Sequence, residues 1–143
     1  MKKNSLCSGA GFTLIELIIV IAVIGIMSAL AISSLSNGAT DAREIVARQQ
    51  QATVQSAVNG WVVGQLSGTA SLSQVRTTYN TKTTSMERLG LVQDYLDEVS
   101  YTHFTDMSED SDEILSAALS KLGWHLSLPD WESGSYPKVD LVK

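Results

Sequence analysis

The stretch GFTLIEL at residues 11–17 opens a run of apolar and small residues that continues to Ile32. Glu16 is the one charged residue between positions 12 and 32. A helix over these 21 residues is roughly 31 Å long at about 1.5 Å per residue, close to the ~30 Å hydrocarbon core of a bilayer. A carboxylate at the centre of such a helix costs roughly 2.5–3.5 kcal/mol. Glu16 is therefore a candidate functional residue that needs a partner.

Charge is distributed unevenly around this run. Lys2 and Lys3 are the only charged residues before it, and without them the chain has 8 basic and 15 acidic residues, a net charge of −7. Basic residues before a span and acidic residues after it place residue 1 in the cytoplasm and the bulk of the chain outside. An acidic exterior domain argues against nucleic acid as a partner, because phosphate binding needs clustered Lys and Arg.

Cys7 is the single cysteine of the chain. No disulfide can form within the chain, so an exterior domain must be held together by packing, ions or neighbours. A lipoprotein cysteine follows its apolar segment, whereas Cys7 precedes the apolar run, which argues against lipidation.

Small residues precede the apolar run, at Ser8-Gly9-Ala10-Gly11, whereas an ordinary secretory signal carries its small residues after the apolar stretch. This inverted order, followed by Phe12 and Glu16, resembles the type IV prepilin leader, which type II secretion pseudopilins also carry. The resemblance covers about residues 1–60. It implies that a membrane aspartyl peptidase cuts after Gly11 and methylates the new amino terminus at Phe12. It also implies an assembly role for Glu16, the fifth mature residue.

Cleavage would create a cation next to the buried acid. The α-amino group of Phe12 would be mostly protonated at neutral pH. Phe12 and Glu16 are neighbours at positions i and i+4 of a helix. The family resemblance adds that Glu16 of an incoming subunit meets the terminal amine of a subunit already in the fibre. The alternative is that Glu16 lies at the membrane edge of an uncleaved anchor.

The pattern beyond the leader predicts an α+β fold, with one long helix packed on a small head of short helices and an antiparallel sheet. The resemblance implies that this fold is pilin-like. The expected division is a leader at 1–11, a membrane and filament-core half of the helix at 12–35, an amphipathic half at 36–66, and a head at 67–143. Many family members carry a proline near position 33, and here Ser33 and the residues around Ser36–Ala39 are expected to loosen the helix. The predicted buried stripe of the amphipathic half comprises Ala42, Ile45, Val46, Gln49, Ala52, Ala57, Val58, Trp61 and Val62.

Within the head, helical spacing and capping residues predict several short elements. Leu72, Val75 and Tyr79 anchor one short helix, and helical pieces at 86–89 and 92–99 are expected to break at Gly90. Ser108 is the expected cap of a helix over 109–122, with Gly123 just past its end. Alternating apolar residues predict strands at 124–128 and 138–142.

Acidic residues crowd one part of the head, with eight acids and no Lys or Arg between Asp94 and Glu113. Their oxygens are the ligands that calcium prefers, so a calcium site is one candidate interpretation, although no EF-hand spacing is present. The candidate ligands are Asp106, Glu109, Asp110, Asp112 and Glu113. The other interpretation is that these acids favour a helix amino terminus.

The remaining polar and aromatic residues do not form a pattern typical of catalysis. His103 and His125 lack a second ligand at metal-binding spacing, and Trp61, Trp124 and Trp131 fit core or subunit contacts better than a ligand box. We therefore expect a structural subunit of a type IV pilus or type II secretion-like pseudopilus and not an enzyme. The alternative is an uncleaved, signal-anchored binding module outside the cytoplasm.

The resemblance also implies partners and a location. The partners are the prepilin peptidase, further copies or related pilin subunits, an inner-membrane platform protein, an assembly ATPase and the membrane. The precursor would cross the inner membrane once, with its amino terminus in the cytoplasm. The fibre would then lie in the periplasm or at the cell surface.

Overall fold

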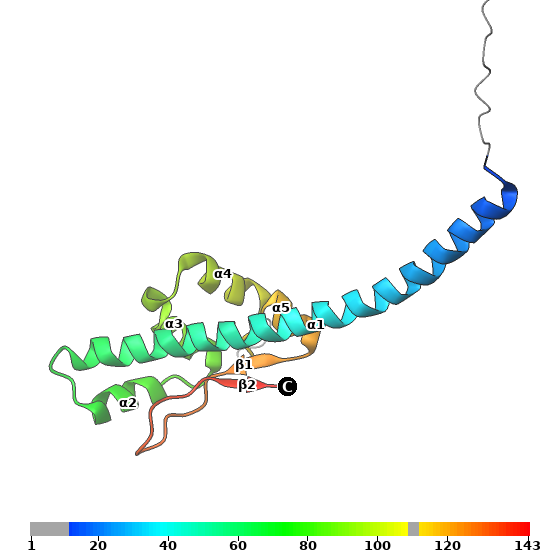
Figure 1. The fold of residues 1–143 in the computed structure, drawn as a ribbon. Coiled ribbons are helices and arrows are strands. Elements are labelled where there is room, and N and C mark those ends of the chain that lie inside the picture. The colour runs from blue at the N-terminus through cyan, green and yellow to red at the C-terminus, as the bar shows by residue number, and fades with distance from the viewer. Residues whose placement is uncertain (1–11, 109–111) are drawn as a thin grey trace, which may run out of the picture. The chain divides into compact units, whose positions relative to one another are not determined.

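The computed structural model describes residues 12–108 and 112–143 of the chain. It comprises two compact units, Met1–Ala39 and Thr40–Lys143. The element order is one long helix, three further helices and a 3-10 turn, a fifth helix and two short strands (Figure 1). This is the α+β, pilin-like arrangement that the sequence predicts, with a long amino-terminal helix followed by a small mixed head.

Helix α1 runs from Leu14 to Leu66, over 53 residues. The helix is continuous through residues 33–40, so the loosening expected around Ser36–Ala39 does not interrupt it. The expectation that Gly64 and Gly68 mark its end is confirmed to within two residues. Gly64 and Gly60 also let the ring of Tyr95 lie against α1, because a Cβ at Gly60 would come within 3.0 Å of Tyr95 Cδ1.

The buried side of the Thr40–Leu66 part of α1 differs from the predicted stripe. Four of the expected residues are buried, whereas the other five are exposed and Ala47 and Val54 are buried instead. Ile45 is 66% exposed, and it lies nine residues, or two and a half turns, from the buried Val54. The exposed five are Ala42, Ile45, Val46, Gln49 and Ala52.

Glutamines explain the difference, because they take places on the covered side of α1. Gln51 Nε2 donates to the Val139 carbonyl at 2.8 Å. Gln55 donates to the Pro137 carbonyl at 2.9 Å and accepts from the Val139 N–H at 2.8 Å. The carboxyl-terminal segment therefore finds its backbone partners on α1, and buried backbone groups need such partners. The predicted stripe contains Gln49 but neither Gln51 nor Gln55, so it misses the two glutamines that pair with the carboxyl-terminal segment.

Helices α2 (Leu72–Asn80) and α3 (Ser85–Leu91) both begin with capping boxes. Ser71 pairs with Gln74, and Thr84 pairs with Glu87, so that side chains satisfy the free N–H groups of the first turn. The prediction that Val75 and Tyr79 anchor a helix is confirmed, since both are buried. The break expected at Gly90 is wrong, because α3 continues to Leu91 before a 3-10 turn, η1 (Gln93–Tyr95).

Helix α4 spans Glu98–Met107 and is capped by Asp97, which accepts from the Ser100 N–H at 2.8 Å. Hydrogen bonds from Ser100 lower the pKa of the Asp97 carboxyl. Ser108 ends this helix, and its Oγ accepts from the Leu115 N–H at 2.9 Å. The prediction that Ser108 starts a helix is therefore wrong.

Helix α5 covers only Ala117–Leu122, with Ser116 as its cap and Gly123 in the left-handed region at φ 69°. The predicted helix over 109–122 is too long, because Ile114 pairs with Leu126 as an isolated antiparallel bridge. Residues 109–111 lie outside the described part of the chain. Sheet pairing thus competes with helix formation for the residues just before Ser116.

Strands β1 (His125–Ser127) and β2 (Asp140–Val142) form the antiparallel pair that the alternating pattern predicts. Leu126 faces Leu141 in the register, and Leu126, Leu128 and Val139 are buried. The core of the Thr40–Lys143 unit gathers the buried side of α1, residues from α2 to α5, and this carboxyl-terminal segment. Trp61 and Trp131 are part of it, as expected, with the ring of Tyr79 at 6.1 Å from each.

Candidate functional site

The candidate processing and assembly site lies at the start of α1. Phe12 is outside the helix and 85% exposed, and the first helical residue is Leu14. Gly11, the residue after which cleavage is expected, lies outside the described residues. Phe12, the first residue of the expected mature product, therefore precedes the first turn of α1.

Thr13 and Glu16 fix this helix start by a reciprocal set of hydrogen bonds. Thr13 donates to Glu16 Oε2 from its backbone N–H and from its hydroxyl, each at 2.9 Å. In return, the Glu16 N–H donates to Thr13 Oγ1 at 3.2 Å. This is a capping box, in which two free N–H groups at a helix start are satisfied by side chains. The carboxylate also lies at the positive end of the helix dipole.

The capping box gives Glu16 a local partner that sequence reasoning missed. The signal that predicts this capping box is the pattern Thr-x-x-Glu before an apolar run. Its threonine is the second residue after the expected cleavage point. Phe12 and Glu16 are four positions apart in the sequence, and the hydrogen bonds at this helix start join Glu16 to Thr13. Pairing of Glu16 with a processed amine at Phe12 stays a prediction, as does its role in assembly.

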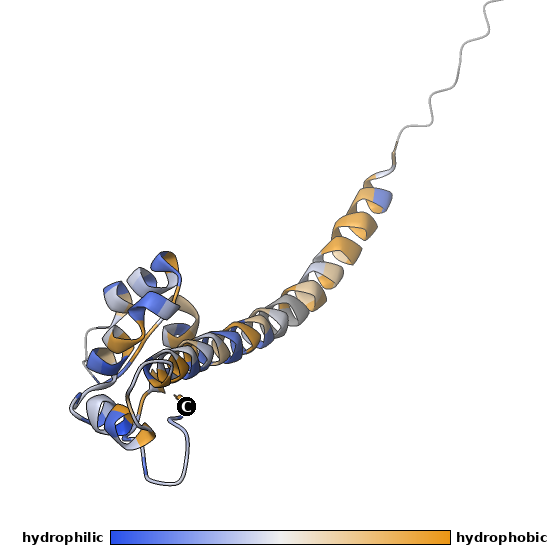
Figure 2. Ribbon diagram, turned by 90° about the vertical axis from the view of Figure 1, so that its left-hand side faces the viewer, coloured by the Kyte–Doolittle hydropathy of each residue, from blue (hydrophilic) through white to orange (hydrophobic). Residues whose placement is uncertain are grey.

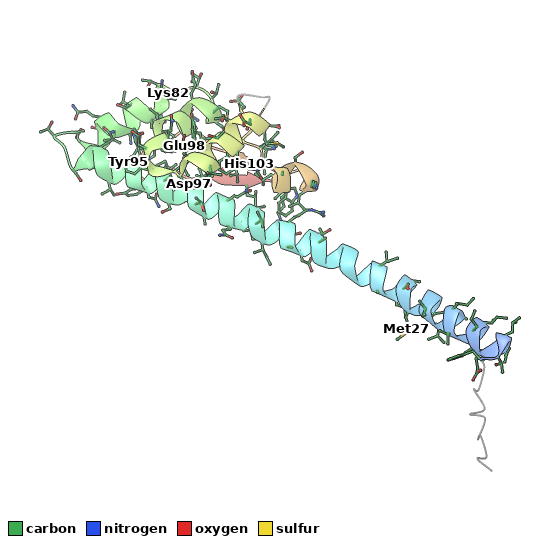
Figure 3. All side chains as sticks on the ribbon, turned by 90° about the horizontal axis from the view of Figure 1, so that it is seen from above. Met27, Lys82, Tyr95, Asp97, Glu98 and His103 are labelled. Atoms are coloured by element: carbon green, nitrogen blue, oxygen red, sulfur yellow. The ribbon has the colours of Figure 1, made fainter. Side chains whose placement is uncertain are left out.

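In the part of the chain that the structure describes, nothing covers the apolar run that follows. Within the described residues, Leu14–Ile32 is a helix long and apolar enough to cross a membrane, and none of it is buried. In Figure 2 most of this segment is orange, and in Figure 3 its side chains, Met27 among them, project into open space. Burying one Leu, Ile or Val contributes about 1.5–3 kcal/mol, so this surface favours lipid or other apolar helices over water.

The calcium candidates are only partly described. Asp106 is exposed on α4 and Asp112 is exposed beyond it, while Glu109 and Asp110 lie outside the described residues. Glu113 lies 3.8 Å from His125 Nδ1. Within residues 12–108 and 112–143, no three acidic, histidine or cysteine side chains gather as a metal site would require. Calcium binding stays a prediction.

The two histidines are in ordinary structural positions. His103 Nε2 accepts a hydrogen bond from the Ala117 N–H at 3.4 Å, which connects α4 to the start of α5. His125 sits on β1 and faces Glu113. Trp124 is half-buried, with the Lys143 ammonium 4.5 Å from the centre of its ring.

Comparison with known proteins bears on the amino-terminal segment alone. Residues 8–32 match the family model of the prokaryotic N-terminal methylation motif. No curated protein and no solved structure matches the chain. The matched segment contains the expected cleavage point, the exposed Phe12 and the Thr13–Glu16 capping box. The amino-terminal segment of this chain, residues 8–32, therefore carries a type IV prepilin-like signal.

Proposed function

We propose that this protein is a structural subunit of a type IV pilus or of a type II secretion-like pseudopilus. It is made as a membrane precursor, cut after Gly11, methylated at Phe12 and polymerised into a helical fibre. The observation that carries the proposal is the match of residues 8–32 to the methylation motif, with Glu16 inside an apolar helix that none of the described residues covers.

The same apolar surface serves two stages in this proposal. In the precursor, Leu14–Ile32 lies in lipid. In the fibre, it packs on the equivalent helices of other copies, which keeps it out of water. The amine freed at Phe12 supplies a positive charge for Glu16 of a neighbouring copy, because an unpaired charge in an apolar core is strongly penalised. The Thr13 hydrogen bonds hold the carboxylate at the helix start before that charge exists.

The proposal includes partners and a location. The prepilin peptidase processes the leader, and an inner-membrane platform protein and a cytoplasmic ATPase drive assembly. The precursor crosses the inner membrane once, with Lys2 and Lys3 in the cytoplasm, and the fibre lies in the periplasm or at the cell surface. We propose no catalytic activity for the chain.

Intact-mass measurement of the protein extracted from membranes tests the processing step. The expected product lacks residues 1–11 and carries one methyl group on Phe12. A product that still begins at Met1 would refute the fibre subunit and favour an uncleaved anchor with an exterior binding module.

Substitution of Glu16 by alanine tests the assembly step. The variant is expected to be cleaved normally and to give at least tenfold fewer fibres in sheared cell fractions. Glu44→Ala is the matched control, because it removes the same charge from the same helix outside the apolar run. Wild-type fibre yields from Glu16→Ala would show that this carboxylate does not guide assembly.

A further inference from the structure

Charge is segregated along the head in a way that the amino-terminal site does not use. Residues 45–86 contain three basic residues and no acid, whereas residues 89–120 contain eight acids and no Lys or Arg. The first stretch forms the head half of α1 and all of α2, and the second forms η1, α4 and the start of α5. The basic residues of the first stretch are Arg48, Arg76 and Lys82.

The described parts of the two stretches include α2 and α4, which lie apart in the Thr40–Lys143 unit (Figure 1). Helix α2 lies on one side of the head half of α1 and α4 on the other (Figures 1 and 2). Figure 3 shows Asp97, Glu98 and His103 together on the α4 side. Helix α2, which carries Arg76, and helix α4, which carries Glu98 and Asp106, are therefore on opposite sides of α1 within each copy (Figure 1).

Each face also presents an aliphatic side chain to solvent next to its charge. On α4, Val99 is 79% exposed, and it shares a shallow groove with Glu98, Thr102, His103 and Asp106. We name Glu98, Val99 and Asp106 the α4 face. On α2, Leu72 is 46% exposed. It is four residues before Arg76, so the two side chains lie on the same side of the helix. We name Leu72 and Arg76 the α2 face.

We propose that, in the fibre, the α4 face of one copy docks on the α2 face of a second copy. This rests on the proposed function and names a contact between heads. A symmetric pairing of two α4 faces would bring acids together, which costs free energy. Contact between the acidic α4 face and the basic α2 face pairs opposite charges. Such a contact is heterologous, because it joins two different faces, and its repetition from copy to copy builds an open helical polymer.

The test uses charge reversal in the full-length chain. Arg76→Glu makes both faces acidic, and the pair Glu98→Lys with Asp106→Lys makes both faces basic. Each variant produced alone is expected to give at least tenfold fewer fibres than wild type. Co-produced, the two are expected to assemble, because each variant offers the charge that the other lacks. A chain carrying all three substitutions is expected to assemble by itself.

Matched controls and salt separate this contact from general charge effects. Lys121→Glu and Glu132→Lys make the same changes at exposed positions on other parts of the head, and they are expected to assemble as wild type does. Charge attraction falls over about 8 Å at 0.15 M salt and about 3 Å at 1 M. The rescued mixture should therefore dissociate into subunits more readily at 1 M salt.

Cross-linking identifies the partner face. A chain with Leu72→Cys and Val99→Cys is expected to give ladders of disulfide-linked copies in fibres, and either substitution alone should not. The native Cys7 lies in the leader and leaves with it. Cross-linking of Val99→Cys to itself would overturn the proposal, because it would show a symmetric contact.

The failure of this inference is distinguishable from the failure of the proposed function. If wild-type protein forms fibres and every charge variant assembles equally well, the docking of α4 on α2 is wrong and the fibre subunit stands. The docking is also wrong if the charge variants fail singly and are not rescued by mixing, since the acids then serve another ligand. If wild-type protein keeps Met1 and forms no fibre, the proposed function itself is wrong.

Discussion

Replacing Arg88 by alanine should destabilise the head more than any other single loss of charge in the described residues. Arg88 is 4% exposed. Its Nη1 donates to the Leu128 carbonyl and its Nη2 to the Lys82 carbonyl, both at 2.6 Å, and Nη2 also contacts the Asp130 carboxylate. Its guanidinium carbon lies 5.3 Å from the centre of the Tyr79 ring. One side chain thus joins α3, the α2–α3 connection and the segment after β1.

The expected loss follows from these contacts. The buried Leu128 carbonyl would lose its guanidinium donor, which costs about 1–3 kcal/mol, and the partly buried Lys82 carbonyl would lose less because water can reach it. Loss of the cation over the Tyr79 ring adds about 1–2 kcal/mol. The ion pair adds little, since the side chain of Asp130 is 77% exposed and solvent screens it. The total is roughly 3–5 kcal/mol, a large fraction of the stability of a small domain.

Urea unfolding of the full-length protein in detergent measures this loss. Fluorescence of Trp61 and Trp131 reports on the affected region, because both rings lie beside Tyr79. With a slope of about 1–3 kcal/mol per molar urea, the Arg88→Ala midpoint should fall by about 2 M.

Two further variants test which contacts of Arg88 account for the loss of unfolding free energy. Arg88→Lys keeps the charge but cannot reach both carbonyls, so an intermediate loss is expected. Asp130→Asn should cost at most about 1 kcal/mol. A loss from Asp130→Asn as large as that from Arg88→Ala would refute the argument, because it would assign the energy to the ion pair and not to the buried carbonyls.

Three other results are expected. Burial raises the pKa of Tyr79 to about 12. The contribution of Tyr79 to stability is therefore intact below its ordinary pKa near 10 and is lost as pH rises from 10 to 12. Unfolding of Tyr79→Phe measured against pH should lack this loss, and the variant should cost little stability at pH 7, since the hydroxyl has no hydrogen-bond partner in the described residues. Gly123→Ala should lower the unfolding free energy by about 1–2 kcal/mol in urea titrations, because φ is 69° there, and an unchanged value would show that α5 can end differently. If the acids around Asp106 bind calcium, added Ca²⁺ should raise the melting temperature and a chelator should reverse the rise; equal melting temperatures would exclude the site.

The elements that sequence predicts well are those with local causes. The length of the apolar run, the cap-forming pairs and Gly123 each act through residues within a few positions, so α1, α2 and the end of α5 are predictable. The Thr13–Glu16 capping box was equally readable, since its pattern spans four residues. The span of α5 was not predictable, because the pairing of Ile114 with Leu126 depends on a strand that comes later in the chain.

By itself the sequence determined the prepilin-like signal, the membrane-length helix and the segregation of charge between residues 45–86 and 89–120. Only the tertiary structure decided which side of α1 is covered, with Ala47 buried and Ile45 exposed, and which backbone groups Gln51 and Gln55 satisfy. The physical reason is that the spacing of hydrophobic residues indicates how much apolar surface a helix has. Which of its side chains are buried depends on the distant segment that packs against it. On α1 the carboxyl-terminal tail is one such segment, and its backbone groups pair with Gln51 and Gln55, which lie outside the predicted stripe.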